Sequence, residues 1–205
     1  HTIRVRVTDY PPFIIRNKDD ESTGIAIDYM KLVAEKTGIE FEYYSSTRTF
    51  RQALNGLIKH QGPDIMPMLV PSQDRKESII FTNEYFNSPY MIFTRADNKQ
   101  IIAHINDLLG KKISLLRGAY LQKMMEKNFP EFNLILCDND IKAIEAVSSG
   151  DADAYIGNMM VTSYIILNRG PYNLKISAPT PFKNQHFSMG VRNDWPELAN
   201  IIDKG

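Results

Sequence analysis

The sequence has one cysteine, widely spaced histidines and no long apolar run, and each scarcity excludes a class of protein. Cys137 alone cannot form an internal disulfide or a cysteine-rich zinc site. None of the four histidines has a partner at a metal-binding spacing, so we expect no metal. No stretch reaches the roughly 18 consecutive apolar residues of a membrane-spanning helix, so no such helix is expected here.

An excess of charge of one sign is also missing. The 24 Lys and Arg balance 24 Asp and Glu, which gives a formal net charge of zero. Proteins that bind nucleic acid or anionic membranes normally carry a basic excess, so we expect no nucleic-acid partner. What is present is an ordinary globular composition, with 43% hydrophobic residues among 205. That length fits one large domain or two lobes of roughly 100 residues.

The motifs of common enzymes are absent. Ser72, Ser114 and Ser163 have no neighbouring histidine, and no Gly-x-Ser-x-Gly turn occurs. Neither type of glycine-rich phosphate loop is present. The sequence therefore gives no support for an enzyme, and we expect no cofactor.

Hydrophobic periodicity predicts an α/β fold in which one pattern occurs twice. Alternation over 3–7 predicts a first strand, and Pro11 and Pro12 end it because proline has no N–H for the ladder. A helix follows over 25–36, with Ile25, Tyr29, Leu32 and Val33 as its expected buried face. The further predicted elements are strands at 39–44, 64–66, 112–116, 133–137 and 152–156, helices at 50–59, 120–128 and about 139–149, and extended segments over 78–94. Alternating strands and helices are typical of a parallel α/β layer.

Five short motifs give the chain a family resemblance. They are Asp9-Tyr10-Pro11-Pro12-Phe13, Gly24-Ile25-Ala26-Ile27-Asp28, Asp64-Ile65-Met66, Ser72-Gln73-Asp74-Arg75 with its following strand, and Gly150-Asp151-Ala152-Asp153-Ala154-Tyr155. In this order and spacing they resemble the family 3 extracytoplasmic solute-binding proteins, the amino-acid-binding Venus-flytrap type. Within that family, 188–192 and 194–198 look most like the sensor domains of membrane-bound histidine kinases.

The resemblance implies a periplasmic-binding-protein type II fold, with two α/β lobes joined by two crossing strands. Lobe one would comprise 1–92 plus 182–205, and lobe two 93–181. A small-molecule ligand would bind in the cleft between the lobes, and lobe closure would be the response. The domain would be periplasmic and tethered to the inner membrane, and its partners would be its own transmembrane and kinase regions. Whether it forms a homodimer is left as an open alternative. We expect a linker to the membrane to begin where the chain stops, at 201–205.

Two other functions stay open beside the sensor domain. One is a freestanding receptor that delivers an amino acid to an ABC-type transporter. The other is a module that closes without ligand and reports on a partner domain.

The resemblance also assigns ligand-binding residues. Arg75 matches the arginine that holds the ligand carboxylate, a role that suits the guanidinium fork. The alternative is a surface arginine in a turn. Arg117, Gly118, Ala119 and Tyr120 match a loop that gives the carboxylate a second contact, and backbone N–H groups at a helix start favour an anion. Because the family often has a hydroxyl residue beside the glycine, only the backbone contribution is expected here.

Departures from the family pattern narrow the expected ligand. Asn158 stands where amino-acid-binding members have an acidic residue for the ammonium group, and an amide lacks the charge that offsets its desolvation. Met68 and Val70 lie in a loop that usually gives a second ammonium contact, yet their side chains are apolar. Asp9 could hold an amine or only cap its turn. Residues that match walls of the cleft are Tyr10, Phe13 and Phe50. A carboxylate with an apolar or aromatic body therefore fits best.

Overall fold

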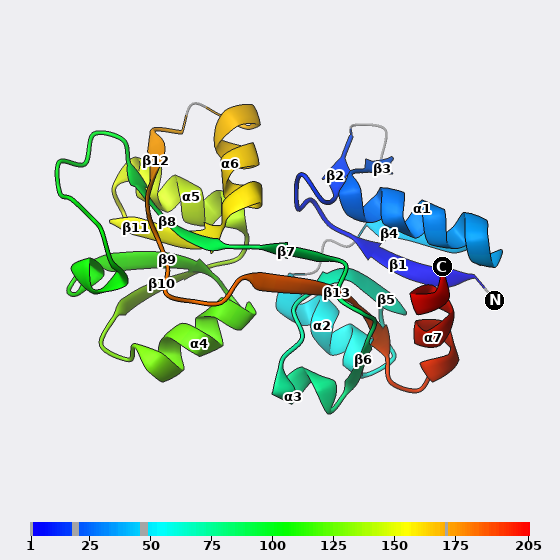
Figure 1. Cartoon of the computed structure of the whole chain (residues 1–205). Coiled ribbons are helices and arrows are strands. Elements are labelled where there is room, and N and C mark those ends of the chain that lie inside the picture. The colour runs from blue at the N-terminus through cyan, green and yellow to red at the C-terminus, as the bar shows by residue number, and fades with distance from the viewer. Residues whose placement is uncertain (1, 18–20, 46–48, 171) are drawn as a thin grey trace. The chain divides into compact units, whose positions relative to one another are not determined.

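The structure, a computed structural model, describes residues 2–17, 21–45, 49–170 and 172–205. The chain divides into two compact units (Figure 1). Unit 1 comprises residues 1–87 and 186–205, and unit 2 comprises 88–185. The chain therefore passes between the units twice, and the segments that do so include β7 (Phe86–Ser88) and β13 (Gln185–Arg192), which pair with each other.

Unit 1 is built on a mixed sheet. Its strands run in the order β4-β1-β5-β13-β6, with bounds β4 (Phe41–Ser45), β1 (Ile3–Val7), β5 (Ile65–Leu69) and β6 (Ile79–Phe81). β1 is parallel to β4 and β5, whereas β13 is antiparallel to β5 and β6. A two-stranded hairpin of β2 (Ile15–Arg16) and β3 (Ser22–Thr23) follows β1.

Helices cover both faces of this sheet. On one face, α1 (Ile25–Thr37) and α7 (Pro196–Lys204) share a core with Ile3 and Val5 of β1. On the other, α2 (Phe50–Ile58) packs Ala53 and Leu57 against strand residues, and α3 (Gln73–Lys76) is a single turn after β5. The alternation of β1 thus places its apolar residues towards α1 and α7.

The buried face of α1 differs from the prediction. Val33 is buried as expected, but Tyr29 and Leu32 are 42% and 45% exposed, and Ala26, Ile27 and Met30 are buried instead. The helix start is apolar on two adjacent stripes, so periodicity alone does not choose between them. Tertiary packing decides, and the Tyr29 ring lies at the margin, 5.1 Å from the ring of Tyr85.

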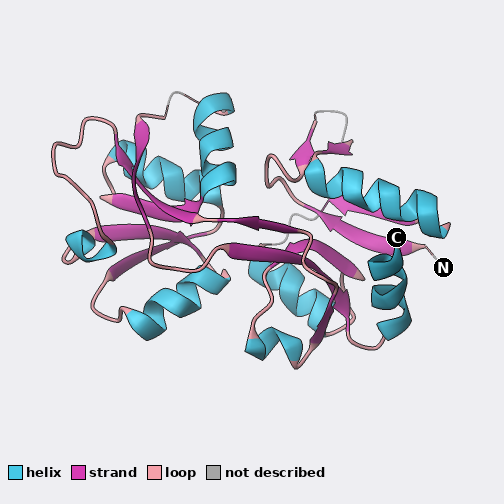
Figure 2. Cartoon of the chain, in the orientation of Figure 1, coloured by secondary structure: helices cyan, strands magenta, loops and turns pink. Residues whose placement is uncertain are grey.

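Unit 2 repeats the layered arrangement with a five-stranded sheet. Its order is β10-β9-β11-β8-β12, with bounds β10 (Asn133–Cys137), β9 (Lys112–Leu116), β11 (Ala154–Asn158), β8 (Tyr90–Arg95) and β12 (Leu174–Pro179). The helices are η1 (Ile105–Leu108), α4 (Tyr120–Asn128), α5 (Asp140–Ser149) and α6 (Met159–Asn168). Figure 2 shows α4 on one side of this sheet and α5 and α6 on the other. The predicted strands at 112–116 and 133–137 and the helix at 120–128 are confirmed.

The observed units differ from the expected lobe boundaries by a few residues. β8 begins at Tyr90 and pairs with β11 from Tyr90 to Thr94, so residues 88–92 belong to unit 2. At the return, Phe182 packs into the core of unit 2 and Gln185 bonds Asn158. Strand pairing therefore moves both boundaries from the positions that the sequence indicated.

None of the helices in the described part of the chain combines the length and apolar character needed to cross a membrane.

Candidate ligand-binding site

The predicted ligand residues of unit 1 follow the carboxyl ends of two neighbouring strands. Asp9 and Tyr10 come just after β1, and Val70 comes directly after β5. These strands are parallel, with Val5 opposite Ile65, so both ends lie at one edge of the sheet. Ligands of open α/β sheets bind at this edge. The ends of β1 and β5 therefore place these residues at one edge of the sheet, and their roles in ligand binding stay predictions.

Arg75 is buried, which removes the surface-turn alternative. It is 7% exposed, and its Nη1 donates to the Val70 carbonyl oxygen at 2.8 Å. Its guanidinium carbon lies 5.6 Å from the centroid of the Phe50 ring, an arrangement that attracts a cation to the ring face. A carbonyl oxygen and an aromatic ring thus contact this guanidinium from within unit 1.

The aromatic residues after β1 form a packed cluster. Phe13 is fully buried, and its ring contacts those of Tyr10, Phe86 and Phe187 at centroid distances of 5.8, 4.7 and 5.6 Å. Tyr10 also meets the edge of Phe187. Phe13 thus supports the loop from within unit 1, whereas the partly exposed Tyr10 and Phe50 keep surface for a ligand wall.

Asp9 and Met68 contact their own unit. One carboxylate oxygen of Asp9 accepts from the Arg16 backbone N–H at 3.4 Å, which ties the turn to the β2–β3 hairpin. The Tyr85 hydroxyl donates to the Pro67 carbonyl at 2.8 Å and lies 2.7 Å from the Met68 sulfur. Burial raises the pKa of Tyr85, so this hydroxyl keeps its proton. The bond of Asp9 reaches the hairpin and does not cap the turn before Pro11, so both roles considered for Asp9 stay predictions.

In unit 2, Arg117 lies on the surface rather than in a buried site. Its side chain is 50% exposed, donates to the Leu136 carbonyl at 2.8 Å and lies 3.6 Å from an Asp138 carboxylate oxygen. The Arg117 backbone N–H donates to the Cys137 carbonyl at 2.8 Å. Arg117 therefore links the end of β9 to the end of β10.

The loop that begins α4 satisfies its own backbone donors. Gly118, at φ 77°, donates its N–H to Oε1 of Gln122 at 2.6 Å. The N–H of Ala119, the N-cap, donates to the Leu116 carbonyl, and Tyr120 begins the helix. Gln122 in turn donates from Nε2 to Glu126 at 2.7 Å. A carboxylate that bound the Gly118 N–H would have to displace the Gln122 amide oxygen.

Asn158 is buried as the N-cap of α6. Its Oδ1 accepts from the backbone N–H groups of Met160 and Val161 and from the Ser88 hydroxyl, at 3.0, 3.2 and 3.1 Å. Its Nδ2 donates to Gln185 at 2.9 Å. An oxygen that already accepts three hydrogen bonds has little capacity left for an ammonium group. The geometry strengthens the interpretation that this position disfavours a standard amino acid.

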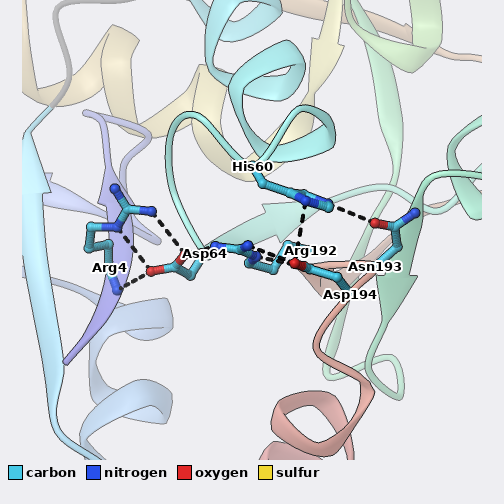
Figure 3. Close-up of polar contacts among 6 residues, drawn as sticks. All are labelled: Arg4, His60, Asp64, Arg192, Asn193 and Asp194. Atoms are coloured by element: carbon cyan, nitrogen blue, oxygen red, sulfur yellow. Dashed lines mark hydrogen bonds and ion pairs between the residues drawn. The ribbon is translucent and has the colours of Figure 1, made fainter. Parts of the chain in front are cut away.

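A network of charged side chains lies at the other end of the unit 1 sheet (Figure 3). Asp64, just before β5, accepts 3.0 Å bonds from Nη2 of Arg4 and Nη1 of Arg192. Arg192 also holds Asp194 at 2.6 and 2.7 Å, and His60 lies 3.3 Å from Asp194. The arrangement joins β1, β5 and β13 before α7 begins, so it holds the sheet together.

Hydrogen bonding dominates the protonation of this network. Burial alone would raise the pKa of Asp64, but hydrogen bonds from Arg4 and Arg192 outweigh burial and lower it. The bonds from Arg192 lower the pKa of Asp194 to about 2. Both carboxylates are therefore charged at neutral pH. Among the described residues, no group of three or more His, Cys, Asp or Glu is arranged to hold a metal ion.

The chain forms two α/β units, each built on its own sheet. Residues 3–205 match the family of bacterial extracellular solute-binding proteins, family 3, and the chain belongs to that family. The domain is accordingly a binding module rather than a catalytic domain, of a class that acts outside the cytoplasm.

Individual relatives are of two kinds. The chain is 22% identical over 196 residues to the sensor protein EvgS of Escherichia coli, covering 95% of this chain and 16% of that protein. A histidine kinase sensor domain with similarity to periplasmic binding proteins aligns at TM-score 0.90 and 23% identity, covering 100% and 88% of the two chains. The arginine-bound form of ArgBP from T. maritima aligns at 0.87 and 21%, covering 99% and 93%. These structural likenesses confirm the Venus-flytrap fold.

Sequence reasoning missed the side chains that occupy the unit 2 loops. Gln122 is the third residue of α4, and a glutamine there commonly reaches back to the residues before the helix. That spacing could have identified it. Ser88 and Gln185 meet Asn158 from far along the chain, and no local pattern indicates those contacts.

Proposed function

We propose that the chain is the periplasmic ligand-sensing domain of a membrane-bound sensor histidine kinase. It would bind a small carboxylate or an amino-acid-like solute, and lobe closure would pass the signal to its own transmembrane and kinase regions. The alignment to EvgS supports this because it covers nearly all of this chain but only 16% of that protein, as one domain of a larger protein would. The tether to the inner membrane belongs to the same proposal.

The buried guanidinium of Arg75 is the observation that carries the proposed binding function. Keeping a cation at 7% exposure costs free energy unless an anion or strong acceptors compensate for lost water. The carbonyl of Val70 and the ring of Phe50 fix the direction of the fork. Such a fork can hold a ligand carboxylate with two parallel charge-assisted hydrogen bonds.

The ligand class follows from the contrast between Arg75 and Asn158. The first offers a positive charge, whereas the second offers a neutral amide whose oxygen accepts three internal hydrogen bonds. Gly118 and Ala119 already have acceptors for their N–H groups, so unit 2 offers fewer donors than the family pattern implies. We infer that the preferred ligand is a monocarboxylate with an apolar or aromatic body.

The test is a thermal-shift screen of amino acids and simple carboxylates on three proteins: the wild type, Arg75→Met and Arg51→Met. Arg51 is an exposed arginine of the same unit, so its variant controls for loss of charge alone. A ligand at 100 times its dissociation constant should stabilise the wild type by about 2.7 kcal/mol. We expect Arg75→Met to lose this shift and Arg51→Met to retain it. An equal shift in all three would refute the Arg75 site.

A freestanding transport receptor is the second candidate, favoured by the likeness to an arginine-bound ArgBP. The gene separates the two, since a transmembrane segment and kinase after residue 205 support the sensor. Binding of arginine in preference to apolar carboxylates would contradict the ligand class proposed above. A flat screen would instead favour the module that closes without ligand.

A further inference from the structure

One strand of unit 1 carries two arginines in opposite electrostatic situations. Arg4 and Arg6 are two residues apart on β1, so their side chains leave the strand on the same face. That face is opposite the one where Ile3 and Val5 pack against α1 and α7. The two arginines thus share a backbone and a sheet face, and they differ in what surrounds them.

Arg4 has a carboxylate and Arg6 does not. Asp64 accepts from Nε and Nη2 of Arg4 at 3.0 Å each, although the Arg4 side chain is 44% exposed. Arg6 is less exposed, and its Nε is buried with no hydrogen-bond partner in the described part of the chain. No carboxylate of the described residues forms an ion pair with it. The more exposed cation is neutralised while the more buried one is not.

The surroundings of the two arginines shift their pKa values in opposite directions. Hydrogen bonding to Asp64 raises the pKa of Arg4, whereas burial lowers the pKa of Arg6 to about 10. Its neighbour across the ladder is Tyr44 of β4, which carries no charge at neutral pH. The Arg6 guanidinium is therefore partly removed from water and has no carboxylate partner among the described residues.

A second orphan donor lies next along the chain. Thr8 follows directly after β1, two residues beyond Arg6, and its hydroxyl is likewise buried without a partner among the described residues. Buried polar groups in folded proteins nearly always have hydrogen-bond partners, so each exception needs an explanation. The Arg6 guanidinium and the Thr8 hydroxyl are two residues apart, and both can donate a hydrogen bond. A bound anion would explain both unpartnered donors.

We propose that Arg6 and Thr8 form a binding site for a small monocarboxylate within unit 1. One anionic charge matches the single guanidinium, and two carboxylate oxygens match a guanidinium N–H and a hydroxyl. The site does not depend on Arg75 or on any residue of unit 2. It stands or falls separately from the proposed sensing function.

The experiment is an acetate titration followed by thermal unfolding, with sodium chloride at equal ionic strength as reference. The wild type should gain about 4 °C when acetate is at roughly ten times its dissociation constant. Arg6→Met should lose this gain and melt higher than the wild type without acetate, because an unpaired buried charge is gone. Arg4→Met, the matched control on the same strand and face, should melt lower because Asp64 loses one of its two arginine partners and keeps only Arg192.

Each other result has a defined meaning. An acetate gain that persists in Arg6→Met, or no gain in the wild type, overturns the site. Stabilisation by phosphate but not by acetate overturns the monocarboxylate assignment. Loss of the gain in Arg75→Met, with Arg6 intact, would assign acetate to Arg75 instead. If Arg6→Met does not fold, Thr8→Val tests the same site and should reduce the gain.

Discussion

The two units share an α/β architecture but differ in how their arginines and backbone donors are hydrogen-bonded. Unit 1 buries the guanidinium of Arg75 against a carbonyl and a ring, and it leaves Arg6 without a carboxylate among the described residues. Unit 2 exposes Arg117 and closes its donors with Gln122 and Asn158. Similar topology thus yields one unit that buries guanidinium nitrogen atoms and one whose loop donors already have acceptors within the unit. Anion binding by this domain should therefore depend chiefly on unit 1.

The largest effect is expected where unit 1 does pair its charges. Asp64→Ala leaves Arg4 and Arg192 facing each other without the shared carboxylate, so we expect a loss of about 3 to 5 kcal/mol in the free energy of unfolding. Urea denaturation measures it. A loss below about 1 kcal/mol would mean that the network behaves as an ordinary surface ion pair.

The corresponding test in unit 2 is Asn158→Ala. The substitution removes the α6 cap and leaves two backbone N–H groups and the Ser88 hydroxyl without their acceptor. We expect a loss of about 2 kcal/mol in the same assay. Asn158→Asp should cost less, because a carboxylate still caps the helix and favours its positive end. Equal losses for both variants would show that the amide donor to Gln185 matters more than the cap.

Acid should weaken unit 1 through its carboxylates. The folded-state pKa of Asp64 is lowered and that of Asp194 is about 2, so both bind protons less readily in the folded chain than when unfolded. Their stabilising contribution is present above about pH 4, the unfolded value, and is lost as pH falls towards 2. Urea midpoints measured from pH 5 to pH 2 should fall, and Asp64→Asn should flatten the fall. An unchanged slope in that variant would contradict the assignment.

The smallest change in stability is expected for a substitution in unit 2. Gln122→Ala removes one acceptor of the Gly118 N–H, and it also removes the exposed hydrogen bond to Glu126. Stability should change by less than about 1 kcal/mol. Affinity for a carboxylate ligand, measured by calorimetry, should rise if the amide oxygen competes with it. A fall in affinity would mean that Gln122 helps to hold the ligand.

Much of the fold was predictable because the relevant signals are local. Alternation in Ile3–Val7 and helical periodicity over about 139–149 indicate their elements from neighbouring residues alone, and the structure has both elements. The buried face of α1 was predicted wrongly at Tyr29 and Leu32, because a helix with two apolar stripes needs a partner surface to select one. Lobe boundaries shifted for a similar reason, since the pairing of β8 with β11 is long-range.

In the candidate site, too, some features were predictable from the sequence and others depend on tertiary contacts. The family resemblance assigned Arg75 to the ligand carboxylate, and it placed the neutral Asn158 where amino-acid-binding members have an acidic residue. The assigned ligand contacts stay predictions, although Arg75 is buried and Phe13 is part of a core cluster. Nothing in the sequence near Arg6 indicated that it lacks a carboxylate while Arg4 has one. That difference depends on Asp64, about 60 residues away, lying beside one arginine only.

The scarcities of the sequence determined which chemistry this chain does not encode. One cysteine, balanced charge and absent catalytic motifs pointed to a binding module, and the family match agrees. Composition fixes which groups exist, and local pattern fixes the elements that carry them. Tertiary structure alone decided which cations were neutralised and which donors were already occupied, because those outcomes depend on burial and on partners distant in the chain.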